Sequence, residues 1–116
     1  MGIWVSHDCW WGSCYAYHRF SVAIARAAGT SMAAIFRGER IKDDIQWLIK
    51  TDPTCGTMGP NRAKLVAVRL RELADKLPLD KREDIDNPNW MRESAIQFAQ
   101  GLETAAQRNE RVRFEY

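Results

Sequence analysis

The chain has 116 residues, of which 46% are apolar, and its 17 basic and 15 acidic side chains give a net charge of +2. This length suits one domain, which can bury about two-thirds of its unfolded surface without a metal ion or disulfides. The small net charge argues against a strongly basic protein that binds long nucleic acids. We therefore expect a single domain over residues 1–116.

The first third of the chain predicts a strand, a loop and a helix. Residues 1–5 are rich in β-formers and predict a short strand, and residues 6–13 then predict a polar-aromatic loop. Apolar side chains at helical spacing predict a helix from residue 12 or 13 to about residue 28, where a glycine ends it. Residues 31–38 are ambiguous between a strand and irregular structure, and we assign no role to residues 31–40.

The rest of the chain predicts helices followed by a strand. Apolar residues at helical spacing predict a short helix that Asp52-Pro53 ends, then helices over about residues 60–77 and 87–107. Gly101 inside the last helix costs about 1 kcal/mol relative to alanine, which predicts a close packing contact there. The alternation of residues 111–116 predicts a half-buried strand.

A strand at each end of the chain, with helices between, predicts an α+β fold. A lone strand leaves its backbone groups unpaired, so the two terminal strands are expected to pair with each other. We expect about four helices packed on a small sheet formed by the N- and C-terminal strands. Trp4, on the first strand, is expected to belong to the core.

The stretch from residue 4 to residue 19 is the best candidate for a functional site. It holds three of the five tryptophans, both histidines and two of the three cysteines. Aromatic surfaces beside hydrogen-bonding groups suit a pocket for a planar, charged ligand. The adjacent Trp10 and Trp11 cannot both face inward from a regular element, so at least one is expected to be exposed. The candidate ligand-binding residues are His7, Asp8, Trp10, Trp11, Ser13, Tyr15, His18 and Arg19.

Arg19 suggests how such a ligand would be held. It lies one helical turn beyond Tyr15, so an aromatic floor with a guanidinium beside it could hold a nucleotide base and its phosphate. In the plainer alternative, Arg19 pairs with Asp8 or with solvent.

Metal binding and catalysis are the other chemistries to weigh. His7, Cys9, Cys14 and His18 are zinc-type residues, but their spacing is not a standard zinc arrangement. His7 and Cys9 would share one side of an extended segment, as Cys-His catalysis requires, yet no oxyanion-stabilising partner is evident. We therefore expect a binding protein rather than an enzyme, without metal or cofactor; a Cys/His hydrolase or zinc protein is the lesser alternative.

Cysteine usage and hydropathy restrict the expected location. Three cysteines cannot form a fully paired extracellular framework, which favours a reducing compartment. The chain begins without the basic cluster and long apolar run of a secretory signal, and no apolar stretch is long enough to span a bilayer. We expect a cytoplasmic protein with no membrane contact.

Three short motifs resemble an uncharacterised group of small bacterial and phage proteins. The group opens with Ser-His-Asp-x-Trp-x-Gly, here residues 6–12, followed by aromatic residues and an arginine, here Arg19. Residues 51–56 resemble its acidic turn, although Pro53 and Thr54 replace acidic positions, and residues 98–114 resemble its closing helix and strand. The resemblance brings no activity; it implies a phage or mobile-element setting, in the host cell cytoplasm if a phage encodes the chain.

These observations together predict a small phage- or prophage-associated binding protein that counters host defence by sequestering a nucleotide-type signal. The alternative is a protein-protein inhibitor that inserts Trp10 or Trp11 into a host defence protein. The sequence also allows a homo-oligomer.

Overall fold

Four short antiparallel strands form one sheet in the order β2-β1-β4-β3. The structure is a computed structural model that describes residues 2–116. β1 (Gly2–Val5) and β4 (Val112–Glu115) pair in the centre, and β2 (Trp10–Ser13) and β3 (Thr57–Met58) form the edges. The prediction of an α+β fold in which the two ends of the chain pair is confirmed.

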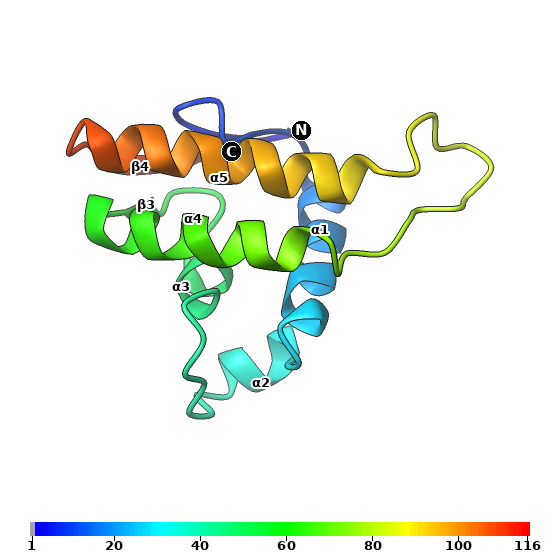
Figure 1. The fold of residues 1–116 in the computed structure, drawn as a ribbon, viewed down its shortest axis with the longest axis horizontal. Coiled ribbons are helices and arrows are strands. Elements are labelled where there is room, and N and C mark those ends of the chain that lie inside the picture. Colours follow the sequence, from blue (N-terminus) through cyan, green and yellow to red (C-terminus); the bar gives the residue numbers. More distant parts are fainter. Residues whose placement is uncertain (1) are drawn as a thin grey trace.

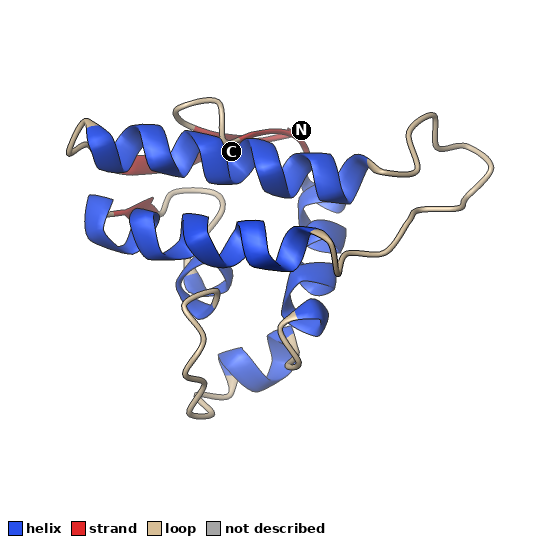
Figure 2. Ribbon diagram, viewed as in Figure 1, coloured by secondary structure: helices blue, strands red, loops and turns tan. Residues whose placement is uncertain are grey.

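Five helices pack on one side of this sheet, where about four were expected (Figures 1 and 2). α4 and α5 lie antiparallel side by side, and the sheet lies against α5 (Figure 1). The extra helix is α2, in the segment that was ambiguous. The helices are α1 (Cys14–Ala27), α2 (Met32–Phe36), α3 (Gln46–Lys50), α4 (Pro60–Ala74) and α5 (Trp90–Gln107). None of the helices in residues 2–116 has the length and apolar character needed to cross a bilayer.

The prediction of one continuous loop over residues 6–13 is wrong. Ser6 to Cys9 form a tight turn, and the following residues form β2, which pairs with β1 in the register Val5 to Trp10. Both central residues of the turn have positive φ, 61° for His7 and 57° for Asp8. The usual sequence signal for such a hairpin is Asn-Gly, so His-Asp gives no indication of it.

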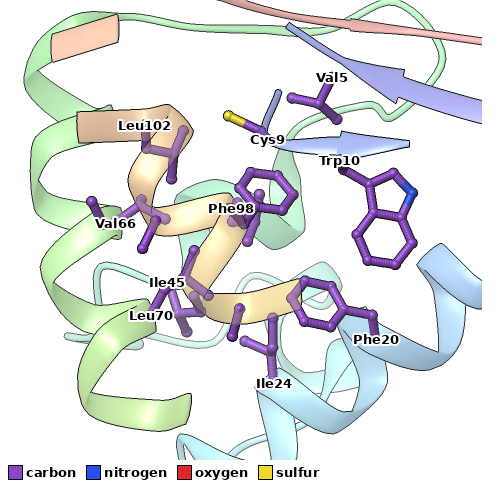
Figure 3. Packing of buried hydrophobic residues seen from close by; sticks show 14 of the residues in the cluster. Val5, Cys9, Trp10, Phe20, Ile24, Ile45, Val66, Leu70, Phe98 and Leu102 are labelled. Carbon is purple, nitrogen blue, oxygen red and sulfur yellow. The ribbon is translucent and has the colours of Figure 1, made fainter. Parts of the chain in front are cut away.

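The core fills the space between the inner face of the sheet and the helices (Figure 3). Val5 and Trp10 from the hairpin meet Phe20 from α1 and Phe98 from α5. The helices cover only this face. Trp4 points to the other face and is 38% exposed, so its expected place in the core is wrong.

Gly101 makes the close contact that its position in a helix predicts. A Cβ atom there would lie 2.5 Å from Cys9 Sγ and 2.6 Å from the carbonyl oxygen of His7. The hairpin turn therefore rests directly on the backbone of α5. Gln97 Nε2 also donates a hydrogen bond to the Asp8 carbonyl oxygen. Together these two contacts fix the position of the following residues, Trp10 and Trp11.

Candidate functional site

The tandem tryptophans leave the hairpin in opposite directions. Trp10 is buried, with its ring centroid 5.1 Å from that of Phe20 and 5.4 Å from that of Tyr17. Trp11 is 83% exposed. Successive side chains of a strand alternate between the two faces of the sheet, so the expectation that one of the pair is exposed is confirmed.

Two adjoining hollows lie beside this hairpin, and both have Trp90 and Ala16 in their walls. We call them together the Trp90 cleft. The smaller hollow, about 190 Å³, is also lined by Cys9, Trp10, Trp11, Gly12, Ser94 and Gln97. The larger, about 270 Å³, is also lined by Tyr15, Arg19, Arg82, Ile85 and Asn87. One hollow is thus aromatic with neutral polar groups, and the other has two arginines.

The indole nitrogen of Trp10 is the most informative atom of the smaller hollow. Trp10 Nε1 is buried, and nothing in residues 2–116 accepts its hydrogen bond. An unsatisfied buried donor costs about 1–3 kcal/mol, so such donors are rare unless an acceptor comes from outside the chain. The hydroxyl of Ser94 and the amide of Gln97 line the same hollow and add further hydrogen-bonding groups.

A buried carboxylate organises the larger hollow. Asp80 Oδ2 accepts hydrogen bonds from Arg19 Nη1 at 3.0 Å, Arg82 Nη2 at 3.0 Å and Trp90 Nε1 at 2.8 Å. The Arg82 and Trp90 hydrogen bonds hold the pKa of Asp80 well below its usual range. One carboxylate thereby fixes two guanidinium groups and the indole of Trp90. Two guanidinium groups thus meet one buried carboxylate here, and Asp84 is a further negative charge that acts on Arg82.

Arg19 thus pairs with Asp80, a partner that neither reading of the sequence predicted; the plainer alternative named Asp8 or solvent. It also lies near the ring of exposed Tyr15, with 5.9 Å between the guanidinium carbon and the ring centroid. The Arg82 side chain is 40% exposed, which leaves room for an acceptor supplied by a ligand. Of the eight predicted site residues, Trp10, Trp11, Tyr15 and Arg19 come together around the cleft.

The other predicted site residues lie elsewhere. His7 and Asp8 line an open depression on the other side of the hairpin turn, which we call the outer depression. Ser13 is the N-cap of α1, with its Oγ accepting the Ala16 N–H at 3.0 Å. His18 is exposed on α1, where it lines a separate cavity and also a hollow that it shares with Tyr15 and Arg19. The outer depression is lined by Trp4, Ser6, His7, Asp8, Arg108, Glu110, Arg111 and Arg113.

A hydrogen-bond chain ties His7 to the end of the molecule. Ser6 Oγ accepts the backbone N–H of Arg113 and lies 2.8 Å from His7 Nδ1. His7 Nε2 lies 3.2 Å from Glu110 Oε1. The His7 side chain therefore holds the turn against the segment that enters β4, which offsets the unfavourable positive φ of this residue.

Asp8 has the same strained backbone without such contacts. Replacing Asp8 by glycine is therefore expected to stabilise the fold by roughly 0.5–1 kcal/mol, because glycine adopts positive φ without steric cost. His7→Gly relieves the same strain but loses the contacts to Ser6 and Glu110, so we expect no gain from it. Urea unfolding of both variants checks the contrast, and equal midpoints for the two would contradict it.

Cys-His catalysis by His7 and Cys9 would need a reactive thiol, and Cys9 does not provide one. Burial, and secondarily the charge of Asp8, raises the pKa of Cys9 to about 12. The thiolate that a nucleophile requires is therefore scarce at neutral pH. In residues 2–116, no three His, Cys, Asp or Glu side chains gather closely enough to hold a metal ion.

About half of the residues that line the cleft could not be predicted from the sequence. Asp80 and Arg82 lie in the connection that follows α4, and Trp90, Ser94 and Gln97 lie on the first two turns of α5. No spacing rule links residues 10–19 to residues 80–97. An unusual tryptophan beside the helix start at Asn87-Pro88 was the only signal for the second wall.

Comparison of the chain with protein-family models, with curated proteins and with solved structures gives no match, so any functional assignment has to start from the geometry of the cleft.

Proposed function

We propose that this chain binds a nucleotide-type small molecule in the Trp90 cleft. The observation that carries the proposal is the buried Trp10 Nε1–H, which has no acceptor within residues 2–116, on a side chain that lines the smaller hollow together with Trp11 and Trp90. Nucleobases offer both a planar face for stacking and ring or carbonyl acceptors on their edges. The base would occupy the smaller hollow and meet Trp10, Ser94 and Gln97.

The arginine end of the cleft supports the phosphate of such a ligand. Arg19 and Arg82 are held in place by Asp80, so little side-chain entropy is lost when they bind an anion. Guanidinium groups suit phosphate because they offer paired, planar donors. A base in the smaller hollow would thus direct the phosphate of the ligand toward the larger hollow with its two arginines.

The biological role that we propose is sequestration of this molecule as a host defence signal, in the cytoplasm of the host cell. The phage or prophage setting rests on the resemblance of the Ser6–Gly12 motif. Sequestration requires tight binding and no reaction, which fits a cleft whose neighbouring thiol, Cys9, is kept protonated.

Titration calorimetry against cyclic dinucleotides and NAD-derived signals tests the proposal. We expect one member of the panel to bind, and Trp11→Ala to weaken that ligand at least tenfold, since stacking on one aromatic ring contributes about 1–3 kcal/mol. Arg82→Gln is expected to weaken phosphate-bearing members and to reduce the salt dependence of their binding.

Two variants outside the cleft are the matched controls. Arg113→Gln removes a guanidinium that lines the outer depression but not the cleft, and Tyr116→Ala removes an exposed aromatic ring that lines neither hollow of the cleft. Both should bind the ligand as the unmodified protein does. If only the control variants lost binding, the ligand would lie outside the Trp90 cleft. A folded protein that binds no member of the panel would refute the proposal.

A second candidate function is inhibition of a host defence protein. The observation that favours it is Trp11, which is 83% exposed on an edge strand, since a protruding tryptophan is a common centre of protein interfaces. In that case a host protein would co-purify with the unmodified chain, would be lost with Trp11→Ala, and no small molecule would bind.

A further inference from the structure

A second cavity, which shares no residue with the Trp90 cleft, lies between α1, α2, α3 and the turn over residues 51–54. We call it the α1–α3 cavity; its volume is about 500 Å³, within the range of small-molecule sites. In Figure 1 these three helices form the corner of the molecule below α4. Of the residues that line it, Ile3, Tyr17 and Ile49 are buried, and Phe36, Lys50 and Asp52 are exposed. The cavity therefore has an apolar floor and a charged rim.

The floor contains one polar group without a partner. Tyr17 is only 6% exposed, and its hydroxyl has no hydrogen-bond partner in residues 2–116. Burial raises the pKa of the Tyr17 phenol well above its usual value, so the group is a neutral donor at physiological pH. Unlike Trp10 Nε1, the Tyr17 hydroxyl is not fully enclosed, so it can donate a hydrogen bond to water or to a ligand in the cavity.

The rim carries one positive and one negative side chain. Lys50 Nζ contacts the amide oxygen of Gln46 at 3.1 Å and lies 5.5 Å from the ring centroid of Trp47, both of them neutral. Asp52 accepts hydrogen bonds from the backbone and hydroxyl groups of Thr54, which lower its pKa and fix the carboxylate. Neither charge is paired with an opposite side chain within residues 2–116.

We propose that the α1–α3 cavity binds a small zwitterion with a large apolar group, the chemical class of an aromatic α-amino acid. The apolar group would fill the floor against Ile3 and Ile49. The carboxylate would face Lys50, and the ammonium group would face Asp52. A zwitterion is chosen because it can pair with both exposed rim charges at once, which a singly charged ligand cannot do.

Three probes of one shape test this assignment by titration calorimetry at millimolar concentration: L-phenylalanine, 3-phenylpropionate and 2-phenylethylamine. We expect phenylalanine to bind one to one and each singly charged probe to bind at least fivefold more weakly. Lys50→Gln should weaken both probes that carry a carboxylate and leave 2-phenylethylamine unchanged. Asp52→Asn, which can keep the turn with Thr54, should show the opposite selectivity.

Tyr17→Phe separates a ligand contact from a structural role. Its lost hydroxyl should weaken phenylalanine binding about fivefold, the value of one hydrogen bond, while the thermal midpoint stays equal or rises because no protein partner is lost. Trp11→Ala, in the Trp90 cleft, should leave phenylalanine binding unchanged, so that the two sites are tested separately. A singly charged probe that binds as tightly as phenylalanine, or the absence of any binding, would overturn the assignment.

Discussion

Replacing Gly101 by alanine is expected to destabilise the protein by about 2–3 kcal/mol and to lower its thermal midpoint by roughly 10 °C. The new methyl group would lie 2.5 Å from Cys9 Sγ and 2.6 Å from the His7 carbonyl oxygen, so the hairpin turn must move away from α5. The gain in helix propensity, about 1 kcal/mol, opposes this loss but is smaller. Urea unfolding with matched thermal melts measures the difference.

Two further variants show whether the steric contact at Gly101 causes this loss of stability. Gln100→Ala, at an exposed neighbouring position on α5, should change stability by less than about 0.5 kcal/mol. Cys9→Ala combined with Gly101→Ala removes the sulfur but leaves the carbonyl oxygen of His7 in place, so it should restore only part of the lost stability. Full recovery in the double variant would show that the backbone contact is not the cause.

Asp80→Asn is expected to produce the other large loss of stability. The Asp80 side chain is 1% exposed and accepts hydrogen bonds from two arginines and from Trp90. An asparagine keeps the shape but carries no charge and only one acceptor oxygen, so Arg19 and Arg82 lose their common counter-ion. Because removing one partner leaves other charges uncompensated, the thermal midpoint should fall by several degrees at neutral pH.

The pH dependence gives this prediction a second readout. The pKa of Asp80 is lower in the folded protein than that of an ordinary aspartate, so the unfolded chain takes up the proton first as the pH falls. The stabilisation is therefore complete above about pH 4 and is lost as the pH falls below that value. We expect the unmodified protein to lose more thermal stability between pH 7 and pH 3 than Asp80→Asn does.

Asp86→Asn is the control for this experiment. Asp86 is exposed in the same connection between α4 and α5, so its removal should leave both the midpoint and its pH dependence unchanged. An Asp80→Asn variant with the same pH dependence as the unmodified protein would contradict the role given to Asp80. Loss of ligand binding in Asp80→Asn would follow from the misplacement of Arg19, Arg82 and Trp90 at one end of the cleft.

Local sequence rules were sufficient where a structural element is determined by its own residues. Ser13 caps α1, and Gly29 follows its C-terminal end with a φ of 80°, both near the predicted positions. The alternation of residues 111–116 corresponds to β4, in which Val112 and Phe114 are buried. The pairing of the two terminal strands also followed, because backbone groups in an isolated strand would lack partners.

The same rules failed where a contact between distant residues overrides local preference. His7 and Asp8 are not the residues expected in a turn with positive φ. The turn persists because two distant residues support it: Gly101 allows it to rest on α5, and Glu110 contacts the His7 ring. Trp4 was expected in the core because strand periodicity does not say which face of a sheet the helices cover. The tertiary structure alone decides that.

From the sequence alone, the aromatic and basic side chains near the N-terminus could be recognised as candidates for a binding site, and at least one of Trp10 and Trp11 could be expected to be exposed. Which of these side chains meet depends on long-range packing. It brings Trp10, Tyr15 and Arg19 to Trp90 and sends His7 and Asp8 to the outer depression. The physical reason is that a cleft forms between segments joined by long-range packing and by the buried Asp80 carboxylate, and neither leaves a periodic pattern in the sequence.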